Sequence, residues 1–240
     1  MSIGYEQVYQ LRTCDFDRYR RPRPASVLDI FQDVAGVNAE SMPGMDLATM
    51  DANHFMWVLT RVKYEVVSNP ALHEQVKVHT WPLAPTRMGF QRECTIKSLD
   101  GQTRIQGSSD WVVLDWAEHN LVPIKEITDG SGDYATEKVF PERLKKIRKF
   151  EPEGEGYKLM PTFTDIDMNG HVNNTKYGDY ALDALELGPD EAIRTFQIDY
   201  RHELHDGEHV MVYTQRGEGE ALVMGMQGEE VAFMVRIELA

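Results

Sequence analysis

Apolar side chains recur every three or four positions in two segments, and this spacing predicts two helices with one buried face each. The first helix is expected to end near Ser41, before Pro43-Gly44, and Ser26 is the expected cap at its beginning. The second is expected to begin near Asn173 and to end at Leu187, before Gly188-Pro189.

The other apolar segments alternate between polar and apolar positions, as strands with one buried face do. Turn signals such as Asn69-Pro70 and Asp100-Gly101 separate them, so consecutive strands are expected to pair as an antiparallel meander. The alternating segments are residues 5–11, 55–67, 75–81, 89–98, 104–115, 221–226 and 230–239.

The second half of the chain repeats the order of the first. Asp15-Phe16-Asp17 precedes the first helix as Asp165-Ile166-Asp167 precedes the second, and similar strands follow each helix. This duplication predicts an α+β fold with two units in tandem, each a long helix wrapped by an antiparallel sheet. We expect the first unit at 1–120, a linker rich in Gly, Pro and charge at 121–156, and the second unit at 157–240.

Composition narrows the class of protein. With 42% apolar residues among 240, the chain can bury a large core. No run of about 18 apolar residues and no signal-peptide profile occurs, so a cytoplasmic protein without a membrane span is expected. Cys14 and Cys94 cannot form a disulfide framework and are expected to be packing residues. The net charge of −14 argues against nucleic acid as a partner.

The stretch from Asp165 to Tyr177 concentrates polar chemistry immediately before the second helix. Asn169 can donate an amide hydrogen bond, His171 can exchange a proton near neutral pH, and Asp167 can orient either one. Free backbone N–H groups at the start of the helix would favour negative charge on a ligand. Glu203, at the end of a nearby strand, is the candidate base that would activate water.

Three other interpretations fit the residues of this stretch less well. A calcium loop would need a glutamate where Lys176 stands and a helix where Pro161 stands. A zinc site from His171, His202 and His205 lacks any paired ligand spacing. A turn that only caps a helix would not need so many polar groups. We therefore expect an active site with no metal and no cofactor.

The run Asp-x-Asn-x-His-Val-Asn-Asn at 167–174, the Tyr200-Arg201-x-Glu203 motif and the duplicated order resemble the acyl-acyl-carrier-protein thioesterases of plants and bacteria. The Trp-Val-Leu-Thr-Arg strand at 57–61 extends the resemblance to the first half. It implies two hotdog domains and a thioester hydrolase that releases free fatty acid from acyl carrier protein and ends chain elongation. It also implies the catalytic residues Asp167, Asn169, His171 and Glu203.

A cysteine of the plant relatives is replaced by Leu204, which argues against a cysteine nucleophile and favours attack by water. The base remains open between Glu203 and His171. Substrate contacts are expected from Asn173, Asn174, Tyr177, Met56, Trp57 and Phe90, the last three in an acyl pocket of the first domain. Docking of the acidic carrier is expected at Arg18, Arg20, Arg21 and Arg23 or at Lys145, Lys146, Arg148 and Lys149.

Rival functions share much of this evidence. The same fold would serve an acyl-coenzyme A thioesterase, a hydroxyacyl-thioester dehydratase or an acyl-binding protein without catalysis. Exposed edges of the predicted sheets leave room for a homodimer.

Overall fold

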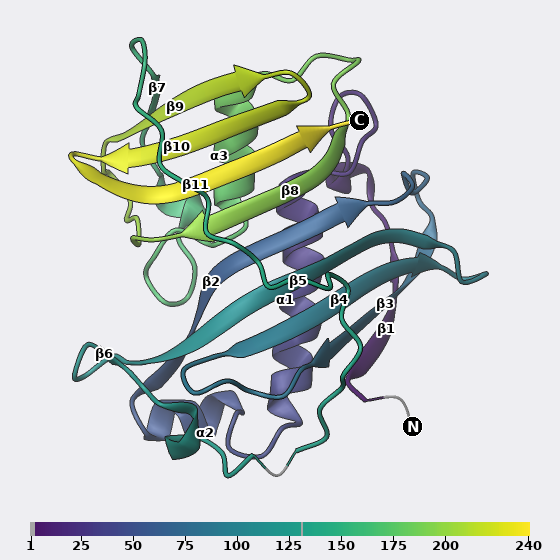
Figure 1. Ribbon diagram of the computed structural model, residues 1–240, viewed down its shortest axis with the longest axis vertical. Coiled ribbons are helices and arrows are strands. Elements are labelled where there is room, and N and C mark those ends of the chain that lie inside the picture. Colours follow the sequence, from purple (N-terminus) through teal and green to yellow (C-terminus); the bar gives the residue numbers. More distant parts are fainter. Residues whose placement is uncertain (1–2, 131) are drawn as a thin grey trace.

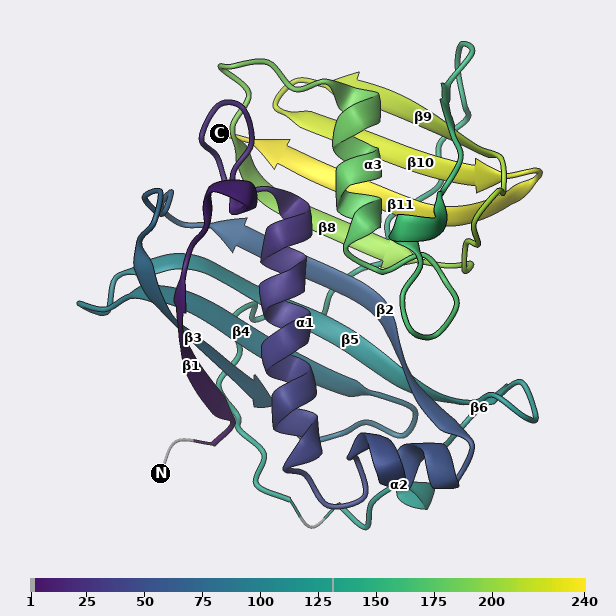
Figure 2. The ribbon, with the colours of Figure 1, turned by 180° about the vertical axis from the view of Figure 1, so that it is seen from behind.

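The computed structural model describes residues 3–130 and 132–240 as a large antiparallel sheet with two helices on one face (Figures 1 and 2). In the described residues the strand order is β1-β3-β4-β5-β2-β8-β11-β10-β9-β7, with β6 paired to β5. The strands are β1 Tyr5–Gln10, β2 Phe55–Val66, β3 Gln75–Pro82, β4 Phe90–Ser98, β5 Thr103–Asp115, β6 Asn120–Leu121, β7 Tyr157–Leu159, β8 Ile193–Tyr200, β9 Val210–Gly217, β10 Glu220–Gln227 and β11 Glu230–Leu239. The helices are α1 Pro24–Glu40, α2 Leu47–Ala52 and α3 Lys176–Leu185, with short 3-10 turns η1 Thr13–Asp15, η2 Ile124–Glu126 and η3 Phe163–Asp165.

The two halves of the chain join where β2 pairs with β8, in a register that sets Arg61 against Asp199 and Glu65 against Thr195. Across this seam the ring of Tyr64 stacks on that of Phe196, with centroids 5.3 Å apart, and both side chains are fully buried. The prediction of an α+β fold with two tandem hotdog units is confirmed: each half wraps part of the sheet around its own long helix.

Helix α1 begins earlier than expected. Pro24 occupies its first turn and Arg23 the cap position, so Ser26 lies inside the helix and is not its cap. Proline suits the first turn because its φ angle is already helical and its missing N–H has no partner there. Phe31 packs onto Gly107 of β5, where an added Cβ would lie 2.4 Å from the phenyl ring. This close approach holds α1 on the sheet.

Helix α3 is shorter than expected. The side chain of Asn173 accepts a hydrogen bond from the backbone N–H of Thr175, and the helix begins only at Lys176. It ends because Glu186 adopts the left-handed conformation, with φ at 49°. Polar residues that bond to nearby backbone delay a helix in this way.

The prediction that consecutive strands pair is wrong for β2 and β3. Strand β2 lies between β5 and β8, while β3 lies between β1 and β4. Turn signals report only where a strand ends, and the partner of β2 is decided by the contact between the two halves of the chain.

Residues 138–150, here called the strap, cross the outer face of the sheet (Figure 1). The backbone N–H of Val139 donates to Glu93, and that of Ile147 donates to Asp199, at 2.8 and 2.7 Å. Asp199 also pairs with Arg61 at 2.6 Å. Buried carboxylates therefore hold an extended segment that has no strand partner of its own.

None of the helices in the described residues is long and apolar enough to cross a membrane.

Candidate active site

The segment from Asp167 to His171 is a tight turn held by its own residues. The N–H of Asp167 donates to the carbonyl of His171 at 2.9 Å, and the carboxylate of Asp167 accepts from the N–H of Asn169 at 2.8 Å. Gly170 has a φ of +83°, which only glycine adopts without strain. The cluster seen in the sequence thus has a defined shape.

The turn is joined to the loop at 201–209, between β8 and β9. The N–H of Val172 donates to the carbonyl of Leu204 at 2.8 Å, and the hydroxyl of Tyr200 donates to the carbonyl of Asn174 at the same distance. Leu204 itself is fully buried. These bonds fix the residues next to Leu204 against the turn.

Glu203 and His171 contact each other as a result. Oε2 of Glu203 lies 3.2 Å from Nε2 of His171, although 31 residues separate them in the chain. Their side chains are 50% and 27% exposed, respectively, so both reach solvent. The pair can take up and return a proton at a place that water can enter.

His205 completes this cluster. Its ring lies edge-on to that of His171, with centroids 4.9 Å apart, and its Nδ1 is 3.3 Å from the carbonyl oxygen of Gly170. Sequence reasoning considered His205 only as a zinc ligand. Its position two residues after Glu203 was the available signal for a place in the site.

A cavity of about 420 Å³ lies beside α1 and reaches the turn. Its lining includes Met56, Trp57 and Phe90 from the first half of the chain together with Asp167 and Asn169 from the second. The rings of Trp57 and Phe90 meet edge to face, with centroids 5.3 Å apart. An apolar space and the polar turn therefore form one continuous site.

The structure separates the expected substrate contacts into two groups. Asn174 lines the cavity together with Met56, Trp57 and Phe90, whereas Asn173 and Tyr177 have other contacts. Asn173 accepts from both the N–H and the hydroxyl of Thr175. Tyr177 is 3% exposed and packs among aromatic rings, and burial raises the pKa of its hydroxyl.

Gln32 on α1 is a second residue that the sequence did not single out. It lines the cavity, and within the described residues its Oε1 is buried without a hydrogen-bond partner. A buried amide oxygen without a partner costs free energy, so it is available to a donor on a ligand. The only signal in the sequence is a polar side chain directly after the buried Phe31.

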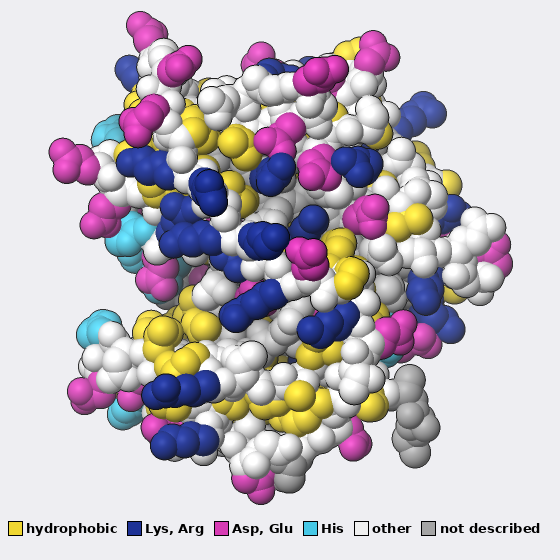
Figure 3. Space-filling model, in the orientation of Figure 1, with side chains coloured by type: hydrophobic (Ala, Val, Ile, Leu, Met, Phe, Trp, Pro, Cys, Tyr) yellow, Lys and Arg dark blue, Asp and Glu magenta, His cyan; other side chains and the backbone are white. Residues whose placement is uncertain are grey.

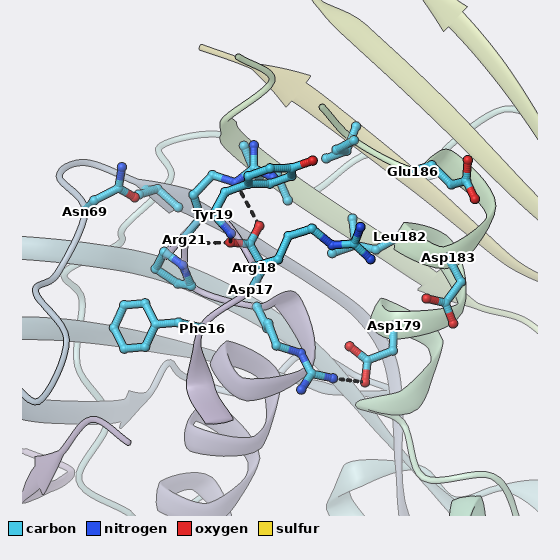
Figure 4. Close-up of a pocket in the computed structure, with 15 residues that line it drawn as sticks. Phe16, Asp17, Arg18, Tyr19, Arg21, Asn69, Asp179, Leu182, Asp183 and Glu186 are labelled. Carbon is cyan, nitrogen blue, oxygen red and sulfur yellow. Dashed lines mark hydrogen bonds and ion pairs between the residues drawn. The ribbon is translucent and has the colours of Figure 1, made fainter. Parts of the chain in front are cut away.

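A second, larger cavity of about 690 Å³ lies between the loop at 16–23 and α3 (Figure 4). Its walls are charged: Arg21 pairs with Asp17 at 2.8 Å and Arg23 with Asp179 at 2.5 Å. Arg21 also donates to the carbonyl of Gly188 at 2.9 Å. Two of the four arginines expected to dock a carrier thus pair with carboxylates of the protein itself.

The fold and the site define a double-hotdog protein in which one polar turn contributes Asp167 and Asn169 to the lining of an apolar cavity and His171 to an acid–imidazole pair with Glu203. Comparison with known families narrows this class. The acyl-ACP thioesterase N-terminal domain matches residues 3–130, and the acyl-ACP thioesterase C-terminal domain matches residues 149–239. The chain therefore belongs to the acyl-ACP (acyl carrier protein) thioesterase family, and the resemblance noted in the sequence is confirmed.

Curated relatives agree with this assignment. The chain is 25% identical over 231 residues to the chloroplastic oleoyl-acyl carrier protein thioesterase 1 of Arabidopsis thaliana, covering 87% of this chain and 63% of the relative. It is 28% identical over 226 residues to the oleoyl-acyl carrier protein thioesterase of Coriandrum sativum, covering 85% and 61%. The chain thus spans about three fifths of the length of these relatives.

Solved structures share the fold. An acyl-ACP thioesterase from Bacteroides thetaiotaomicron superposes with a TM-score of 0.83 at 24% identity, covering 98% of this chain and 97% of the other. A 12:0-ACP thioesterase from Umbellularia californica gives 0.84 at 22% identity, covering 98% and 96%. At these identities the likeness concerns the fold alone.

Proposed function

We propose that this protein hydrolyses fatty-acyl thioesters of acyl carrier protein, releasing free fatty acid and so ending chain elongation. One observation carries the proposal: the cavity lined by Met56, Trp57 and Phe90 is continuous with Asp167 and Asn169. Its volume of about 420 Å³ lies in the range of sites that enclose small ligands. An acyl chain in the cavity would place its thioester at the polar turn.

Glu203 is the proposed base. We infer that Nε2 of His171 carries a hydrogen, because Oε2 of Glu203 lies 3.2 Å from that nitrogen and a carboxylate oxygen only accepts hydrogen bonds. His171 then cannot take a proton from water at Nε2, whereas Glu203 can do so with its exposed oxygen. His171 holds the carboxylate in place and stabilises its charge.

Asn169 is the proposed donor to the carbonyl oxygen of the thioester. Its backbone N–H is bound to Asp167, and the residue lines the cavity, so its side-chain amide is the donor left for a ligand. The role earlier expected of N–H groups at the start of the helix is not retained, since Asn173 accepts from the N–H of Thr175. Amide donors aimed at a developing oxyanion stabilise the transition state of acyl transfer.

The proposed reaction balances without a cofactor. Glu203 takes one proton from water while the water oxygen bonds to the carbonyl carbon. The tetrahedral intermediate then collapses, the carbon–sulfur bond breaks, and the proton held by Glu203 passes to the leaving sulfur. The products are a fatty acid and the free thiol of the carrier.

The strap is the proposed docking surface for the carrier. Leu144 and Ile147 are buried, while Lys145, Lys146, Arg148 and Lys149 between and beyond them are exposed. Figure 3 displays Lys and Arg side chains gathered on the face that the strap crosses. The carbonyl of Ile147 accepts a hydrogen bond from Arg201, two residues before Glu203. This bond joins the strap to the loop that carries the proposed base.

Charge complementarity supports the strap over the arginines at 18–23. The whole chain carries −14, so a local group of exposed cations would direct an acidic partner to this face. Arg21 and Arg23 are paired with Asp17 and Asp179, which cancels their charge. They line a cavity separate from the one beside Asp167.

Free thiol release from a series of acyl thioesters, carried on acyl carrier protein and on coenzyme A, tests this function. We expect release from the carrier-bound series and a loss of at least about a hundredfold in kcat for Glu203→Gln. Glu230→Gln is the matched control, because Glu230 also lies beside a histidine, His202, at 3.8 Å. No release from any thioester would overturn the proposal, and loss of water from a hydroxyacyl thioester would identify a dehydratase instead.

A further inference from the structure

His205 carries an inference beyond the proposed reaction. Its ring touches His171 on one side, and its Nδ1 lies 3.3 Å from the carbonyl of Gly170. Its own backbone N–H donates to the carboxylate of Glu208 at 2.8 Å. His205 therefore links the loop at 201–209, which carries Glu203, to the turn that carries His171.

The tautomer of His205 follows from this geometry. A carbonyl oxygen accepts hydrogen bonds and cannot donate them, so Nδ1 of His205 must carry the hydrogen. In a neutral ring the Nε2 atom is then without a hydrogen. His205 is exposed, and none of the hydrogen bonds among the described residues involves its Nε2.

The carbonyl that His205 binds belongs to the residue just before His171. Gly170 is held in the left-handed conformation and its N–H donates to the carbonyl of Asp167 at 3.1 Å, while its own carbonyl faces His205. A donor on the carbonyl of Gly170 limits rotation of the peptide that leads into His171. The imidazole of His171 is then kept where its Nε2 faces Glu203.

We propose that His205 is a positioning residue: through its Nδ1–H bond to Gly170 and its ring contact with His171, it keeps His171 directed at Glu203. The inference rests on the proposed function for its kinetic effect. Preorganisation of this kind acts on the chemical step, because misplacement of a reacting group by a fraction of an ångström lowers kcat. It has little effect on the acyl cavity and hence on KM.

Three substitutions separate this role from others. The amide nitrogen of Asn lies near the place of Nδ1, so His205→Asn keeps a donor for Gly170. The amide nitrogen of Gln lies near the place of Nε2, so His205→Gln loses the donor to Gly170. His205→Ala has no side-chain nitrogen at either place. We expect kcat to fall roughly tenfold in His205→Gln and His205→Ala, and at most about threefold in His205→Asn, with KM within about twofold of wild type.

Nitrogen-detected NMR of the histidine rings gives a readout that needs no activity. At pH 8 we expect Nδ1 of His205 and Nε2 of His171 to carry hydrogen, and the His171 signals to shift in His205→Ala but return towards wild type in His205→Asn. Thermal unfolding of each variant verifies that it is folded. Hydrogen on Nε2 of His205, or equal loss of kcat in all three folded variants, would overturn the inference. If wild type released no thiol while the tautomers were as expected, only the proposed function would fail.

Discussion

Arg21 and His171 occupy equivalent positions in two loops that fold alike. The N–H of Asp17 donates to the carbonyl of Arg21 at 2.8 Å, as the N–H of Asp167 donates to that of His171 at 2.9 Å. Each aspartate also accepts, through its side chain, from the N–H two residues on, at 2.8 Å in both loops. The duplication read from the sequence thus extends to individual hydrogen bonds.

The two loops differ in the contacts that their equivalent residues, His171 and Arg21, make. Where the second unit has His171 beside Glu203, the first has Arg21, which donates to the carbonyls of Gly188 and Glu191 in the other unit, at 2.9 and 2.6 Å. One copy of the loop carries the candidate chemistry, and the other joins the two units.

Replacement of Arg21 by Ala should therefore destabilise the fold without changing the chemical step. The side chain of Arg21 is 14% exposed, and loss of its charged hydrogen bonds should lower the free energy of unfolding by about 2 kcal/mol. Urea denaturation measures this, and Arg18→Ala, in the same loop, should change it by less than about 0.5 kcal/mol. A tenfold loss of kcat in folded Arg21→Ala would contradict this division of roles.

Gly36 offers a test of the acyl cavity. It lies on α1 and lines the cavity, and an added Cβ would meet no atom within 4 Å. Gly36→Ala should raise the free energy of unfolding by about 1 kcal/mol, since alanine favours a helix, and should leave kcat unchanged. Gly36→Phe should lower kcat/KM for long acyl chains more than for short ones. An unchanged chain-length profile in Gly36→Phe would show that the acyl group lies elsewhere.

The docking surface can be tested by reversing charge on the strap. Lys145→Glu combined with Lys149→Glu should raise KM for carrier-bound substrates at least about tenfold, since an acidic carrier would be repelled. KM for the same acyl group on pantetheine, which lacks the carrier, should not change. High salt should reduce the difference between wild type and variant. An equal effect on both substrates, or a larger effect of Arg18→Glu, would place docking elsewhere.

Glu93 should give stability a distinct pH dependence. Its carboxylate is fully buried beneath the strap, and burial raises its pKa above the ordinary value of 4.5, although bonds from Val139 and Ser108 act in the opposite direction. A group whose pKa is raised in the folded protein binds more protons there than in the unfolded chain. Its contribution to the free energy of unfolding therefore falls as pH rises from 4.5 through the folded pKa.

Glu93→Gln removes this titration. The stability of wild type relative to Glu93→Gln should be greatest below pH 4.5 and should decline as pH rises above it. Denaturation of both proteins in urea across pH 4 to 8 measures the difference. A difference that grows with pH would mean that the buried carboxylate is stabilised as an anion.

Much of this protein could be read from its sequence, because the signals are local. The spacing of Val27, Phe31 and Val34 indicates a helix with one buried face, and the polar group of Asp167, Asn169 and His171 lies within five consecutive residues. A side chain's face in a helix or strand depends on its neighbours in the chain. Periodicity therefore predicted the two long helices, most strands and the duplication, while the local cluster of polar residues indicated the centre of the candidate site.

Tertiary structure decided what depends on contacts between distant residues. The place of β2 beside β8 follows from packing of Tyr64 on Phe196, which no local pattern contains. Likewise, the bond from Val172 to Leu204 brings Glu203 to His171, while Asn173 bonds to Thr175 immediately before α3. Hydrogen bonds and burial across the chain select one pairing among many that alternation alone permits, and so only the folded protein assigns each polar residue to its partner.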